Sequence, residues 1–142
     1  MGGRREVRTH AAIDARLVGV PVETSDGSAT VRLATTPEMA ADDHGLVHGG
    51  FVFGLADYAA MLAVNESTVV LASCECRFVA PVAVGDRIEA AAEVHANDGK
   101  KRTVGVVVTR DRTMVFEGTF HCTVPTRHVL DREPTTDRRG AR

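Results

Sequence analysis

Residues 44–65, HGLVHGGFVFGLADYAAMLAVN, contain the most apolar run of the chain, yet an aspartate, Asp57, lies within it. From residue 51 to residue 64 apolar side chains occupy every face of the expected helix, which is typical of a helix surrounded by other elements. A lone ionised carboxylate is costly to bury unless it is paired, hydrogen-bonded or protonated. Asp57 is therefore a candidate for chemistry on a buried central helix over about 51–64.

Two glycines, Gly49 and Gly50, precede this helix and allow the backbone to approach a ligand closely. The first N–H groups of a helix lack intrahelical acceptors, so this start is a candidate site for a carbonyl or an oxyanion. Asp57 follows Gly50 by seven residues, which is roughly 10 Å along the axis at 1.5 Å per residue. One helix cannot bring both groups to one carbonyl, so we expect a functional dimer in which a second copy supplies one of them.

The rest of the chain predicts strands around this helix. SATVRLAT precedes it, and TVVLASCECRFVA, DRIEAAAEV, RTVGVVVTR and TMVFEGTFHCTV follow it, joined by the turn signals VGD, NDGK and RDR. The one-sided alternation of these segments predicts an antiparallel meander that covers the helix with one face. The expected fold class is α+β.

The ends of the chain show weaker patterns. A short amphipathic helix is expected at about 9–18, with Thr9 as its cap and Gly19 as its stop. The charged, Pro- and Thr-containing segment 126–142 lacks periodicity and is expected to be disordered. We therefore expect a single domain over 1–125 followed by a tail.

Composition excludes several classes of function. The chain has 142 residues, 44% of them hydrophobic, and a formal net charge of -2, which gives no basic field for nucleic acid or an anionic membrane surface. No apolar run approaches the roughly 18 to 20 residues that a membrane span needs. The first residues lack the apolar region of a secretory signal, so we expect a cytoplasmic protein.

The cysteines and histidines do not predict a metal site. The three cysteines, Cys74, Cys76 and Cys122, lack zinc-binding spacing and are expected to be reduced core thiols. A catalytic cysteine is disfavoured by their strand pattern. His44 and His48 lie in an acidic loop that no regular element holds in place, so we expect this loop to be solvated.

The residues around Asp57 form a pattern that resembles the phenylacetate-degradation (PaaI-like) branch of the hot dog fold thioesterases. The matching residues are His48, Gly49, Gly50, Phe53, Leu55, Ala56, Asp57, Ala63 and Asn65, together with the segment FVAPVAVGDRIEAAAEV. The resemblance covers residues 9–124 and extends to the order of one helix followed by four strands. It implies a hot dog fold, in which an antiparallel β-sheet wraps around one long central α-helix.

The resemblance also implies an activity, the hydrolysis of an aryl- or medium-chain acyl-CoA thioester at a homodimer interface, without a metal or an organic cofactor. Asp57 would act as general base or nucleophile. The backbone N–H of Gly49, with Gly50 beside it, would polarise the thioester carbonyl, and His48 would support that end of the site. Whether two such dimers associate further is left open.

Other candidate residues are less firmly placed. Asp42 stands where close relatives often carry asparagine near the reactive centre, so we expect it at the substrate. Lys101 and Arg102 are candidates for the phosphates of CoA, although NDGKKR is also typical of a solvated hairpin turn. Ser73 is the nearest hydroxyl after the helix, and we leave it out of the site because its register is not fixed.

Three alternatives remain open at this point. Asp57 could be a structural carboxylate tied to backbone N–H groups. The domain could bind acyl-CoA without turning it over. It could also be a hot dog dehydratase or hydratase, although the catalytic histidine and partner acid that such enzymes present are not found in the expected arrangement.

Overall fold

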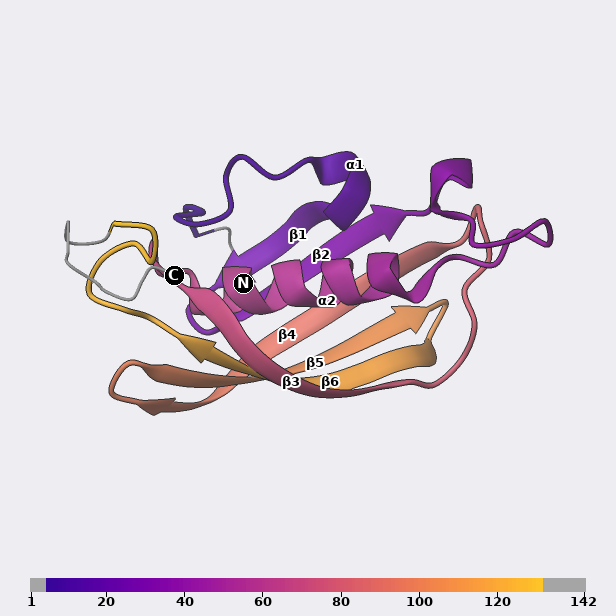
Figure 1. Ribbon diagram of the computed structural model, residues 1–142. Helices are drawn as coiled ribbons and strands as arrows, with labels where there is room; N and C mark the ends of the chain where they lie inside the picture. The colour runs from indigo at the N-terminus through magenta and orange to yellow at the C-terminus, as the bar shows by residue number, and fades with distance from the viewer. Residues whose placement is uncertain (1–4, 132–142) are drawn as a thin grey trace, which may run out of the picture.

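The computed structural model describes residues 5–131, in which an antiparallel six-stranded sheet curves around one long helix (Figure 1). The helices are α1 (Ala15–Val18), the 3-10 turn η1 (Pro37–Met39) and α2 (Gly49–Val64). The strands are β1 (Val20–Ser25), β2 (Ser28–Ala34), β3 (Val70–Phe78), β4 (Arg87–Asp98), β5 (Lys101–Arg110) and β6 (Thr113–Thr123). Residues 132–142, most of the tail expected to be disordered, lie outside the described residues.

The central helix α2 lies in the concave face of the sheet and packs against β2, β4 and β5 (Figure 1). It begins at Gly49, two residues before the expected start, and its apolar side chains are buried around most of its circumference. Along β4, Ile88 and Ala90 are buried whereas Arg87 is exposed, so the sheet covers the helix with one face as predicted. Burial of these facing apolar surfaces is the main favourable contribution to the fold.

The strand order differs from the expected meander. The order is β1-β2-β4-β5-β6-β3, so β4, β5 and β6 follow one another but β3 pairs with β6 at the sheet edge. Residues 79–86 cross from that edge to β4, which lies beside β2. Thr35, at the end of β2, holds this crossing: its hydroxyl donates to the carbonyl oxygens of Ala83 and Asp86 and accepts the N–H of Gly85. A long connection fixed in this way does not make the tight hairpin that sequential pairing requires.

The N-terminal helix is shorter than expected. It spans only Ala15–Val18, and Asp14 caps it by accepting the N–H of Arg16, so the prediction of a helix over 9–18 capped by Thr9 is wrong. The hydroxyl of Thr9 instead lies 2.8 Å from Nδ1 of His10, whose φ of 55° is incompatible with a continuing helix. Gly19 ends the helix as predicted, with a φ of 104°.

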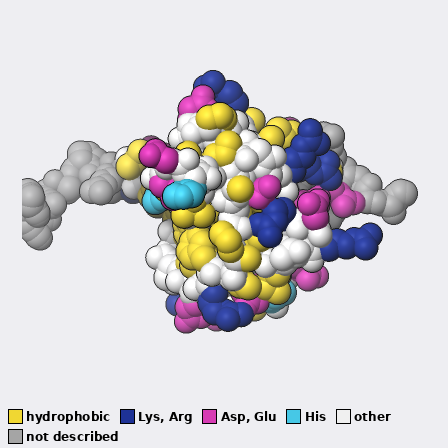
Figure 2. All heavy atoms as spheres, turned by 90° about the vertical axis from the view of Figure 1, so that its right-hand side faces the viewer, with side chains coloured by type: hydrophobic (Ala, Val, Ile, Leu, Met, Phe, Trp, Pro, Cys, Tyr) yellow, Lys and Arg dark blue, Asp and Glu magenta, His cyan; other side chains and the backbone are white. Residues whose placement is uncertain are grey.

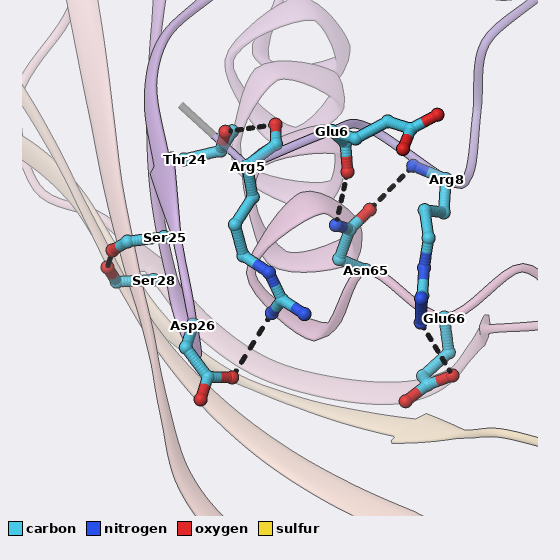
Figure 3. A network of polar contacts seen from close by, with 9 residues as sticks. All are labelled: Arg5, Glu6, Arg8, Thr24, Ser25, Asp26, Ser28, Asn65 and Glu66. Carbon is cyan, nitrogen blue, oxygen red and sulfur yellow. Dashed lines mark hydrogen bonds and ion pairs between the residues drawn. The ribbon is translucent and has the colours of Figure 1, made fainter. Parts of the chain in front are cut away.

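The segment before α1 is held by Asn65, a buried asparagine at the C-terminal end of α2 (Figure 3). Asn65 adopts the left-handed conformation that ends the helix, with a φ of 53°. Its side-chain Oδ1 accepts the N–H of Arg8 and its Nδ2 donates to the carbonyl of Glu6, both at 2.8 Å. Arg5 adds two hydrogen bonds to Thr24 of β1. The N-terminal segment therefore lies along β1 and the end of α2.

We expect Asn65→Gly to destabilise the protein by about 1–3 kcal/mol, the usual effect of leaving buried polar groups without their hydrogen-bond partner. Glycine keeps the left-handed conformation, so the change removes the two hydrogen bonds without straining the helix end. Urea unfolding at fixed protein concentration measures the difference. Arg8→Ala is the control, because it removes only a half-exposed ion pair to Glu66 at 3.7 Å, for which about 0.5 kcal/mol or less is expected. Equal effects of the two changes would contradict the role given to Asn65.

No helix within residues 5–131 is both long enough and apolar enough to cross a membrane.

Candidate active site

The candidate residues lie along a seam between α2 and the inner face of β3, which run in opposite directions. Gly49 and Asp57 lie on one face of α2, since they are eight residues apart. A Cβ added to Gly49 would lie 3.3 Å from the ring of Phe78, at the end of β3. Asp57 lies further along, close enough to Cys74 for its charge to raise the pKa of that thiol. The seam therefore has a glycine end and an aspartate end.

Asp57 is the most unusual group of the seam. Its Oδ1 is buried and has no hydrogen-bond partner within residues 5–131. Burial raises the pKa of its carboxyl group to about 6. Burial, the neighbouring Cys76 and the charge of Asp57 raise the pKa of Cys74 to about 12, and burial with the same charge raises the pKa of Cys122 to about 11. At neutral pH the two thiols are protonated and the aspartate is an ionised base of raised basicity.

The start of α2 presents free backbone donors. Within residues 5–131 no acceptor binds the N–H of Gly49 or Gly50, which belong to the first helical turn. The N–H of His48 donates to the carbonyl of Met39 at 2.9 Å, which anchors the loop to the helix start. The imidazole of His48 lies over Gly50 and meets the ring of Phe51 edge-on, at 6.2 Å between centroids. His48 thus flanks the free N–H groups.

Within one copy the two ends of the seam do not meet. Eight residues of helix separate Gly49 from Asp57, which is roughly 12 Å along the axis. This distance exceeds what a single carbonyl group with an attacking water can span. The structure thus agrees with the separation deduced from the sequence.

An apolar hollow of about 320 Å³ adjoins the glycine end of the seam. Its walls are Leu46, Val47, Gly49, Val52, Phe78, Val79, Ala80, Pro81 and Val82. Figure 2 shows this end of the molecule, where hydrophobic side chains gather below a group of acidic and histidine side chains. No charged or polar side chain lines the hollow, so it fits an apolar group.

Asp42 lies in the loop that leads to α2. Its Oδ1 accepts the N–H groups of His44 and Leu46, at 3.0 and 3.1 Å. The side chain therefore folds its own loop, and a contact with substrate stays a prediction.

Lys101 and Arg102 lie at the opposite end of α2 from Gly49. They begin β5 at the hairpin from β4, and Arg102 lines a hollow with Asn65 and Glu66, beyond the end of the helix. The guanidinium of Arg102 donates to the carbonyls of Gly99 and Lys101, at 2.8 and 3.1 Å, which holds the turn. The 16 residues of α2, about 24 Å, separate this hairpin from Gly49 in one copy. Binding of Lys101 and Arg102 to the CoA phosphates stays a prediction.

The strand after the helix presents a thiol, and not a hydroxyl, to Asp57. Ser73 pairs with His121 on the outer face of the sheet, whereas Cys74 pairs with the core residue Phe120 and lies on the inner face. From the sequence, Cys74 is expected only to be a core thiol. Side chains alternate between the two faces of β3, so Cys74 lies on the same face as Phe78. This alternation predicts the position of Cys74 only when the face that Phe78 occupies is known.

Comparison with known proteins identifies the family. Residues 44–117 match the model of the thioesterase superfamily. The chain belongs to that superfamily. The crystal structure of an uncharacterized protein from Pyrococcus horikoshii has a TM-score of 0.89 and 53% identity, covering 90% of this chain and 98% of that one. The predicted hot dog fold and the resemblance to its thioesterases are confirmed.

Two further relatives differ in how much of their own length this chain covers. Acyl-coenzyme A thioesterase PaaI from Escherichia coli is 32% identical over 114 residues, covering 75% of this chain and 80% of that protein. Methylthioribose-1-phosphate isomerase from Aquifex aeolicus is 50% identical over 115 residues, which are 81% of this chain but 25% of that protein. The thioesterase superfamily chain thus spans a quarter of the Aquifex protein.

Proposed function

We propose that this chain hydrolyses acyl-CoA thioesters as a homodimer with its active sites between the two copies. Asp57 of one copy would act on a thioester whose carbonyl binds the N–H of Gly49 in the other. The observation that carries the proposal is the buried Oδ1 of Asp57, which has no hydrogen-bond partner within the described residues. A structural carboxylate would be held by donors. The relation to PaaI of Escherichia coli supports the same activity.

Two routes of hydrolysis use this geometry. As a general base, Asp57 takes a proton from water while the water oxygen attacks the thioester carbon. As a nucleophile, Asp57 attacks that carbon itself, and water then hydrolyses the resulting anhydride. In both routes the carbonyl oxygen gains negative charge, which the N–H of Gly49 and the positive end of α2 stabilise. The C–S bond then breaks and CoA leaves as its thiolate, which takes up the proton held by Asp57 in the first route and a proton from water in the second. Both routes proceed without a metal or an organic cofactor.

The apolar hollow beside Gly49 supports an aryl or medium-chain acyl group as the substrate. Its walls offer no partner for a charged or hydrogen-bonding acyl group, and burying a polar group without a partner is costly. Lys101 and Arg102 supply the positive charge proposed for the CoA phosphates, and Gly50 and Asp42 complete the proposed binding residues. We place the activity in the cytoplasm.

The test is release of free thiol from a panel of phenylacetyl-, hydroxyphenylacetyl-, benzoyl- and straight-chain acyl-CoA substrates. Turnover is expected on at least one of the apolar acyl groups and should be weaker for the hydroxylated one. Tight acyl-CoA binding without thiol release would contradict the enzyme and indicate a binding module. Hydration of an enoyl-CoA at constant thiol would instead indicate a hydratase.

A further inference from the structure

The apolar hollow at the start of α2 has a closed floor and an open rim. The floor consists of three valines, Val47, Val52 and Val82, which are 4%, 4% and 3% exposed. The rim includes Phe78 and Val79, which are 54% and 45% exposed. A group that enters the hollow past the rim therefore ends against the three valines.

Backbone hydrogen bonds hold this valine floor in place. The N–H of Val47 donates to the carbonyl of Val82 at 2.8 Å, and the N–H of Val84 donates to the carbonyl of Gly45 at the same distance. Val52 belongs to the first turn of α2, so the helix fixes its backbone. Moving the floor to admit a longer group would break such bonds, which is costly for buried backbone groups. The floor therefore limits the depth of the hollow.

The hollow suits the acyl part of a thioester better than the CoA part. Gly49 lines the hollow, and its N–H has no acceptor within residues 5–131. A thioester carbonyl bound to that N–H places one side of the thioester in the hollow. The pantetheine arm of CoA carries amide groups, which would be buried among side chains that offer them no hydrogen bond. An acyl group without polar atoms avoids this cost.

The volume of the hollow bounds the size of that acyl group. It is about 320 Å³, roughly twice the volume of a cavity, about 150 Å³, that binds one benzene molecule. One aromatic ring with its linker, or a chain of medium length, fits above the valine floor. The end of a longer chain would either overpack the floor or stay in water, so its last methylene groups add no affinity.

We infer that Val47, Val52 and Val82 set the upper size of the acyl group that this chain accepts. This size limit rests on the proposed function, which places the thioester carbonyl at Gly49. A smaller side chain in the floor deepens the hollow and admits a longer acyl chain. A larger side chain makes the hollow shallower and excludes chains that the wild type accepts.

Binding of S-alkyl-CoA thioethers tests the floor independently of turnover, because a thioether has no carbonyl group to hydrolyse. Isothermal titration calorimetry gives the Kd of S-hexyl-CoA and of S-decyl-CoA, and the ratio of the decyl to the hexyl value measures the limit. For Val52→Ala we expect this ratio to fall roughly fourfold for each further methylene group that becomes buried. For Val82→Leu, on a different segment, we expect the ratio to rise by a similar factor.

Val104→Ala is the matched control, because it removes the same atoms from a fully buried valine of β5 that does not line the hollow. Thermal unfolding first confirms that each variant is folded, and the control should leave the Kd ratio unchanged. A ratio that neither floor variant shifts, or that Val104→Ala shifts equally, would overturn the inference.

Thiol release from hexanoyl- and decanoyl-CoA separates this inference from the proposed function. Shifted Kd ratios in a protein that releases no thiol from any acyl-CoA would overturn the proposed function alone. Thiol release whose chain-length preference is the same in wild type, Val52→Ala and Val82→Leu would overturn the size limit alone.

Discussion

Asp57→Asn is expected to lower kcat for thioester hydrolysis roughly 10²–10⁴-fold, the usual contribution of a positioned acid–base group. Asparagine has nearly the same size and shape, but it can neither take a proton from water nor attack the thioester carbon. Thiol release on the best substrate of the panel, with wild type and variant measured side by side, gives the ratio. A variant with wild-type turnover would make Asp57 a structural residue.

The thermal stability of Asp57→Asn distinguishes a loss of activity from a loss of folding. Burial raises the pKa of Asp57 from 3.8 in the ordinary carboxyl group to about 6, so the folded protein binds this proton more tightly than the unfolded chain does. Ionisation of Asp57 therefore opposes folding, and its contribution to stability falls as pH rises from about 4 to about 6. At pH 7.5 Asp57→Asn removes this unfavourable charge. Its thermal unfolding midpoint should lie close to that of wild type or above it.

The pH dependence of wild-type turnover follows from the same pKa. The ionised form of Asp57 is the active one, so kcat/KM should rise with pH through about 6 and then level off. An ascending limb centred near pH 4 would show that the reacting carboxylate is not buried in the free enzyme.

The central helix could be predicted because it depends on local sequence, and the candidate site on it is proposed from the same local sequence. The apolar run that follows Gly49 predicts a buried helix whatever surrounds it, and the start of α2 differs by only two residues from the expected position. The residues adjacent to Asp57 in the sequence are apolar, which alone indicates a carboxylate without a charged partner nearby in the chain. The contrast between an apolar environment and a carboxylate makes Asp57 a candidate before any fold is known.

Other features could not be predicted because they depend on contacts between distant segments. β3 pairs with β6 and not with β4, and the crossing from β3 to β4 is held by Thr35, which follows a strand far away in the sequence. Only this pairing shows that Cys74, and not Ser73, lies on the inner face. The two residues held by Asn65, at the far end of α2, are Glu6 and Arg8, which lie just before the expected first helix.

Gly49→Pro is expected to lower kcat roughly 10²–10³-fold by removing the N–H that stabilises the carbonyl oxygen, as removal of one oxyanion donor does elsewhere. Gly49 is the first residue of α2, where proline is favoured because the N–H has no intrahelical acceptor. His48 has φ -62° and ψ 134°, the extended conformation that a residue before proline prefers. The substitution therefore deletes one donor while leaving the helix start in place.

Gly49→Ala is the matched control for this experiment. Both variants introduce a Cβ 3.3 Å from the ring of Phe78, which is 54% exposed, but alanine keeps the N–H. Alanine should change kcat less than roughly tenfold, well below the loss expected when an oxyanion donor is removed. The ratio between the two variants then measures the hydrogen bond itself, separately from the added bulk. Equal turnover in the two variants would show that the N–H of Gly49 does not bind the reacting carbonyl, and would leave Asp57 acting on a thioester held by other donors.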